Sequence, residues 1–109
     1  MNKIALEEHF ITQSLEPYLL PAMPAVSDEA RKQLLAQLSD FGEKRLSAMD
    51  AAGVDVAVLS VTGPGVQAER DPAKASELAR GANDELAKEI VMQPDRYRGF
   101  AHLAMQDAK

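Results

Sequence analysis

The 109-residue sequence contains no cysteine. This absence excludes a disulfide framework, a thiolate nucleophile and a cysteine-rich zinc site. Any bound metal must therefore be held by oxygen and imidazole ligands. Because disulfides are rare in the cytoplasm, the absence of cysteine is compatible with a cytoplasmic protein, and we expect one.

Long apolar runs are also lacking, since no segment approaches the roughly 20 residues that a membrane-spanning helix needs. The N-terminus carries one lysine and reaches Glu7 and Glu8 before any apolar run of about 7 residues, so it does not predict a secretory signal. We expect no membrane association.

An excess of positive charge is absent as well. Twelve Lys and Arg residues are scattered among seventeen Asp and Glu residues, and the net charge is −5. A surface that binds nucleic acid needs clustered basic residues, so this distribution argues against one. Small-molecule chemistry is the better expectation for this chain.

Three stretches predict strands, at residues 4–10, 54–61 and 97–105. A helix is predicted between the second and third strands, because Asp71 is a suitable N-cap, Pro72 fits the first helical position and Pro94 prevents continuation. The alternation of strands with helical crossovers predicts an α/β fold with a parallel sheet and right-handed connections.

The connection between the first two strands has two parts. Pro17, Pro21 and Pro24 predict a rigid, non-helical excursion. The part that follows predicts helix, capped by Ser27 and interrupted by a second capping signal at residues 40–43, so we expect two helices or one kinked helix. Gly53 suits the left-handed position just past the helix end.

The candidate site is the run Glu7-Glu8-His9 at the end of the first strand. Side chains two apart on a strand point to the same side, so Glu7 and His9 face together and Glu8 faces away. A carboxylate and an imidazole on one face suit a divalent ion at about 2.0–2.2 Å. A hydrogen-bonded structural pair is the alternative, since the spacing alone is weak evidence.

Six segments of the sequence, the first strand among them, resemble the γ-resorcylate (2,6-dihydroxybenzoate) decarboxylases. This family belongs to the amidohydrolase superfamily and is related to the aminocarboxymuconate-semialdehyde decarboxylases. The segments are residues 3–10, 45–60, 64–67, 79–87, 94–96 and 100–103. The resemblance implies a (βα)8 TIM-type barrel, which usually needs about 250 residues. Residues 1–109 are then expected to be a single incomplete domain, the first third of such a barrel.

The resemblance also implies the chemistry. Glu7 and His9 are then metal ligands, the ion is zinc or manganese, and it stabilises the charge of a small aromatic carboxylic acid that loses carbon dioxide without oxidation. The remaining ligands and the proton donor are expected beyond residue 109, so the catalytic acid is unknown. The family also implies a homo-oligomer.

Two residues after the second strand, Thr62 and Gln67, are candidates for hydrogen bonds to a phenolic substrate; the alternative is that their loop is simply a turn. Gly63 and Gly65 do not complete a dinucleotide-binding motif. His102 lies among apolar neighbours, which indicates a hydrogen-bonded structural histidine rather than a ligand.

Two alternatives to the decarboxylase stay open. One is a metal-dependent hydrolase on the same barrel, and the other is an inactive fragment. Three parallel strands with two open edges would leave backbone groups unpaired and helix faces uncovered, so we expect the isolated chain to be inactive and to associate, to be partly disordered, or to need a missing remainder.

Overall fold

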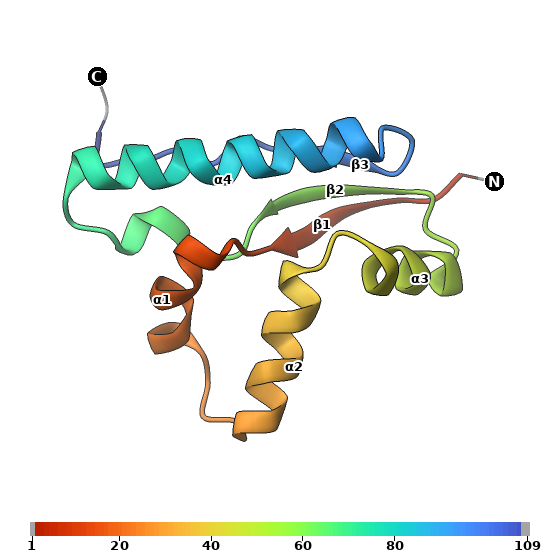
Figure 1. Cartoon of the computed structure of the whole chain (residues 1–109), viewed down its shortest axis with the longest axis horizontal. Helices are drawn as coiled ribbons and strands as arrows, with labels where there is room; N and C mark the ends of the chain where they lie inside the picture. The colour runs from red at the N-terminus through yellow and green to blue at the C-terminus, as the bar shows by residue number, and fades with distance from the viewer. Residues whose placement is uncertain (1, 108–109) are drawn as a thin grey trace.

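A computed structural model describes residues 2–107 of the chain, in which strands and helices alternate (Figure 1). The strands are β1 (Ile4–Phe10), β2 (Val56–Val61) and β3 (Tyr97–Gly99). The α-helices are α1 (Glu16–Leu19), α2 (Asp28–Ser39), α3 (Glu43–Ala52) and α4 (Pro72–Met92), and the 3-10 turns are η1 (Gln13–Leu15), η2 (Leu20–Ala22) and η3 (Gly65–Ala68). Within residues 2–107 no helix is long and apolar enough to cross a membrane.

The three strands form one parallel sheet in the order β1-β2-β3. The predicted α/β fold with three parallel strands and helical crossovers is therefore confirmed. The pairing of β1 with β2 is irregular between Ala5 and Glu8, where two residues of β1 stand opposite Val58 alone. Such a bulge re-aims side chains, and this one includes Glu7, the first of the two predicted ligands.

One face of the sheet is covered by helices. Phe10, Leu59 and Tyr97, one from each strand, are fully buried on this face. They pack in one cluster with Met49 of α3 and Leu86 of α4, so both helices cover the same side. In Figure 1, α4 runs alongside β2 and β3, whereas α2 projects away from the sheet. The other face of the sheet is left open within the described residues.

The close approach of α4 to β3 depends on Gly99. A Cβ atom at this position would lie 2.4 Å from Cδ2 of Leu86. Real Cβ atoms do not come so close to a neighbour, so the absence of a side chain at Gly99 lets α4 pack closely against β3.

A second cluster fixes the loops that follow β1 and β2. It joins Ile11, Leu15 and Leu19, which follow β1, to Val66 of η3 and to the small residues of α4. Ala75, Ala79 and Ala82 form this face of α4 and are buried. The loops at the carboxyl ends of the first two strands are therefore packed against a helix.

The prediction of a non-helical excursion was wrong for residues 13–22. Two short 3-10 turns and α1 occupy this segment, and Pro17 and Pro21 sit in the first turn of α1 and η2. Proline is tolerated there because a first-turn N–H has no intrahelical acceptor. Burial of Leu15 and Leu19 favours the helical arrangement.

The predicted N-caps at Ser27 and Asp71 are confirmed, whereas α3 begins at Glu43 with Gly42, not Asp40, as its N-cap. Ser27 Oγ accepts a hydrogen bond from Ala30 N at 3.2 Å at the start of α2. The Asp71 side chain accepts from Ala73 N at 3.1 Å at the start of α4. Two helices follow the proline segment, and Gly53 ends α3 with a left-handed φ of 71°.

Two strand boundaries differ from the prediction. β2 begins at Val56 rather than at residue 54, because Val54 N donates to Met49 O at 2.8 Å and completes the end of α3. β3 ends at Gly99 rather than at residue 105. The backbone of His102 bonds to the Asn83 side chain of α4 instead, at 2.7 and 3.0 Å, so this segment leaves β2.

Candidate metal centre

Glu7 and His9 lie near the carboxyl end of β1, and both are exposed. Their neighbours Glu8 and Phe10 turn toward the helices. Phe10 is fully buried and Glu8 lines a cavity beside α2 and α3. The alternation of residues 7 to 10 then puts Glu7 and His9 on the open face of the sheet, and Glu7 is itself one of the two bulged residues. The two predicted ligands thus share a face, and Glu8 does not.

His9 has a neighbour on β2 that the sequence analysis did not single out. Ser60 is its register partner, and Ser60 Oγ lies 3.2 Å from Nδ1 of His9. When Nδ1 donates its proton to this hydroxyl, the lone pair of Nε2 is left for a metal ion. The sequence does mark Ser60 as the one polar residue in the apolar strand β2, but only the strand register shows that it pairs with His9.

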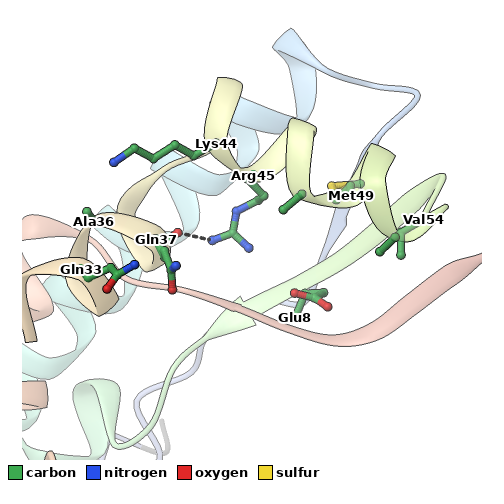
Figure 2. Close-up of a pocket in the computed structure, with 10 residues that line it drawn as sticks. Glu8, Gln33, Ala36, Gln37, Lys44, Arg45, Met49 and Val54 are labelled. Atoms are coloured by element: carbon green, nitrogen blue, oxygen red, sulfur yellow. Dashed lines mark hydrogen bonds between the residues drawn. The ribbon is translucent and has the colours of Figure 1, made fainter. Parts of the chain in front are cut away.

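Arg45 of α3 is the second residue that sequence reasoning missed. Its Nη2 atom donates to the backbone carbonyl of His9 at 2.9 Å, across 36 positions of sequence. Figure 2 shows the guanidinium between α2 and α3 on the side of the sheet to which Glu8 belongs, with a dashed line to Gln37. Nothing in the local sequence connects Arg45 with His9, so only the fold reveals the contact.

The cavity beside Glu8 measures about 580 Å³ and is lined by α2, α3 and β1. It lies on the helix side of the sheet, away from Glu7 and His9. Its lining includes the apolar Met49 and Val54 and the basic Lys44 and Arg45. This cavity is therefore separate from the predicted metal ligands.

The donor set fits part of a metal site. One carboxylate and one imidazole match the oxygen and nitrogen ligands that zinc and manganese accept. Among residues 2–107, however, no group of three or more His, Cys, Asp or Glu side chains is placed to hold a metal. A zinc site usually has at least three protein ligands, so Glu7 and His9 alone do not complete one.

The loop after β2 holds the two predicted substrate residues. Thr62 follows the strand directly, and its N–H donates to Phe10 O at 2.9 Å. Gln67 is exposed, but its amide bonds to the chain after β3, donating to Leu103 O at 2.6 Å and accepting from Met105 N at 3.3 Å. No hydrogen bond within residues 2–107 joins either side chain to His9, so their role in substrate binding stays a prediction.

His102 has the structural role that the sequence indicates. Its Nε2 accepts a hydrogen bond from Val66 N at 3.0 Å. Burial lowers the pKa of His102, which keeps the imidazole neutral and able to accept. Gly65 makes room for the ring, since a Cβ there would lie 2.5 Å from Nε2. The hydrogen bond between Val66 and the His102 ring therefore joins η3 to the segment after β3.

The chain is similar to known decarboxylases over nearly its whole length, although no protein-family model matches it. It is 45% identical over 106 residues to the γ-resorcylate decarboxylase of Polaromonas sp. (strain JS666 / ATCC BAA-500) and 43% identical over 106 residues to that of Rhizobium radiobacter. These matches cover 97% of this chain and 32% of each relative. The chain therefore spans about one third of the length of the curated relatives it matches.

Solved structures agree with the sequence comparison. A dihydroxybenzoic acid decarboxylase of Polaromonas sp. JS666, with bound manganese and the inhibitor 2-nitroresorcinol, matches with a TM-score of 0.87 and 43% identity, over 97% of this chain and 31% of that one. A 5-carboxyvanillate decarboxylase of Novosphingobium aromaticivorans DSM 12444, also with manganese, matches with a TM-score of 0.86 and 37% identity, over 97% and 35%. In sequence and in fold, the chain is thus similar to the N-terminal third of γ-resorcylate decarboxylases, and a putative amidohydrolase of Staphylococcus aureus is also among the similar structures.

Proposed function

We propose that the whole protein catalyses the metal-dependent, non-oxidative decarboxylation of a hydroxylated aromatic acid of the 2,6-dihydroxybenzoate type. The observation that carries the proposal is the pair Glu7 and His9, exposed together at the carboxyl end of β1. This is the end of the strands where parallel barrels place their active sites. The identity of 45% to a γ-resorcylate decarboxylase supports the same reaction class.

Glu7 and His9 would hold a divalent ion. Manganese is the first choice because three of the similar structures contain it, and zinc is the second because it accepts the same ligands. When bound, the ion supplies Lewis-acid stabilisation of the negative charge on the substrate carboxylate and its neighbouring phenolic oxygen. The reaction then needs no organic cofactor.

The other residues of the chain have supporting roles in this proposal. Ser60 Oγ would accept a hydrogen bond from the Nδ1–H group of His9, which leaves the Nε2 lone pair free for the ion. Thr62, at the end of the neighbouring strand, is proposed to bind the substrate. Gln67 is proposed to do so as well, and a direct contact requires its amide to leave the backbone of residues 103 and 105. We assign no proton donor among residues 2–107.

The proposal includes a homo-oligomer in the cytoplasm. Large apolar side chains are exposed within the described residues, among them Ile4, Leu6, Phe100, Leu103 and Met105 at 57–70%. Such exposure favours burial against further parts of the protein or another copy. Light scattering of the purified whole protein measures its mass, and a monomeric mass contradicts the oligomer.

Carbon dioxide release from 2,6-dihydroxybenzoate tests the function directly. The whole protein is assayed with manganese, alongside Glu7→Gln, His9→Ala and the control Glu8→Gln, whose side chain lies on the helix side of the same strand. We expect release that requires Glu7, His9 and the ion but not Glu8. Stoichiometric metal without release favours a hydrolase instead, and a protein that binds no divalent ion contradicts the site itself.

A further inference from the structure

The side chain of Arg45, on α3, donates hydrogen bonds to four backbone carbonyls. Its Nη2 lies 2.9 Å from His9 O, 3.2 Å from Leu38 O and 3.3 Å from Gln37 O. Its Nε donates to Asp40 O at 2.7 Å. One guanidinium therefore joins the end of β1 to the last turn of α2 and to the loop that follows it.

The contact with His9 occurs on the edge of β1 that pairs with no strand within residues 2–107. Phe10 O accepts from Thr62 N at 2.9 Å, on the side of β2. Successive carbonyls along a strand point to opposite edges, so His9 O points away from β2. On that same edge Ile11 N donates to Leu38 O at 3.2 Å. The end of α2 and Arg45 thus occupy the place of a neighbouring strand beside His9.

The surroundings hold the guanidinium in position. Its Cζ atom lies 5.6 Å from the centre of the Phe41 ring, a cation–π contact. Phe41 in turn packs between Phe10 and Tyr97 of the core. Burial lowers the pKa of the Arg45 guanidinium, and the nearby Glu8 is among the groups that oppose this shift. Arginine remains charged in proteins, so the hydrogen bonds from the Arg45 guanidinium to the backbone carbonyls persist across ordinary pH.

We propose that Arg45 is a positioning residue for His9, an inference that rests on the proposed metal site. Arg45 fixes the backbone of the ligand residue from the helix side, while Ser60 orients its ring from the open face. Metal-ligand distances vary by only about 0.2 Å between good sites, so a strand end free to shift binds an ion less tightly. Lysine cannot replace the planar fork that bonds several carbonyls at once.

Manganese affinity, measured by calorimetric titration of the whole protein, tests this role. We expect Arg45→Gln to weaken the Kd about 100-fold and Arg45→Lys about 10-fold, within the range that residues supporting a metal ligand show. Arg80→Gln, an exposed arginine of α4, serves as the control and should leave the Kd unchanged. Urea unfolding in the presence of a chelator reports the stability of each metal-free variant.

The outcomes separate the inference from the proposed function. A Kd unchanged in the Arg45 variants, with or without lower stability, shows a purely structural residue and overturns the inference. Should Arg45→Gln fail to fold, Arg45→Lys decides by the same criterion. If the unaltered protein binds no manganese, the metal site fails and the inference fails with it. Manganese binding that depends on His9 but not on Arg45 refutes the inference alone.

Discussion

The substitution Gly65→Ala tests how the loop after β2 is held. Gly65 has a φ of 57°, in the left-handed region, where an L-residue costs roughly 1–2 kcal/mol. The added Cβ would lie 2.5 Å from Nε2 and 2.8 Å from Cε1 of His102. Because no Cβ tolerates such a distance, the imidazole must move away from the loop.

Moving the imidazole breaks a second interaction. Nε2 of His102 accepts from Val66 N at 3.0 Å, and the Val66 side chain is fully buried. A buried backbone donor without a partner costs about 1–3 kcal/mol. Added to the backbone strain, the expected loss in the free energy of unfolding is about 2–5 kcal/mol.

Urea denaturation of the whole protein at neutral pH measures this loss, with Gly81→Ala as the matched control. Gly81 lies inside α4, and a Cβ there would meet nothing within 4 Å. Alanine is the better helix former, so the control should gain up to about 1 kcal/mol. A loss below about 1 kcal/mol in Gly65→Ala, less than the strain alone, would refute the reasoning.

Three further results are expected. Burial lowers the pKa of His102 below the 6.5 of the unfolded chain. The neutral imidazole therefore contributes its full stabilisation above pH 6.5, and this contribution is lost as the pH falls through the lower folded-state pKa. Urea unfolding measured from neutral to acidic pH should show a fall in the free energy of unfolding that His102→Gln reduces. Leu86→Ala should lower the free energy of unfolding by about 2–5 kcal/mol, since Leu86 is only 4% exposed. Val91→Ala is the control and should change it little, because Val91 is 77% exposed, and equal losses would contradict the packing of α4. Ser60→Ala should weaken manganese binding about 10-fold by releasing Nδ1 of His9, and an unchanged titration argues against that hydrogen bond.

Much of the fold follows from local patterns in the sequence. The apolar strands, the caps at Ser27 and Asp71 and the left-handed Gly53 all predict elements that the structure contains. These signals act within a few residues of one another, so they can be read without knowing the fold. The parallel order of the strands then follows from the helical crossovers.

The errors lie where tertiary contacts override a local rule. The prolines of residues 13–22 occupy the first turns of short helices because Leu15 and Leu19 are buried against α4 and η3. The strand predicted to reach residue 105 ends at Gly99 because Asn83 of α4 takes the backbone of His102. Neither partner is close in sequence to the segment it redirects.

The sequence by itself determined the element order and the pairing of Glu7 with His9 on one face of a strand, because side-chain direction alternates locally. Only the tertiary structure decided what surrounds that pair. Strand register puts Ser60 beside the His9 ring, and packing of the crossover helices brings Arg45 to its carbonyl. Contacts across 36 and 51 positions depend on how whole elements dock, which no local pattern specifies.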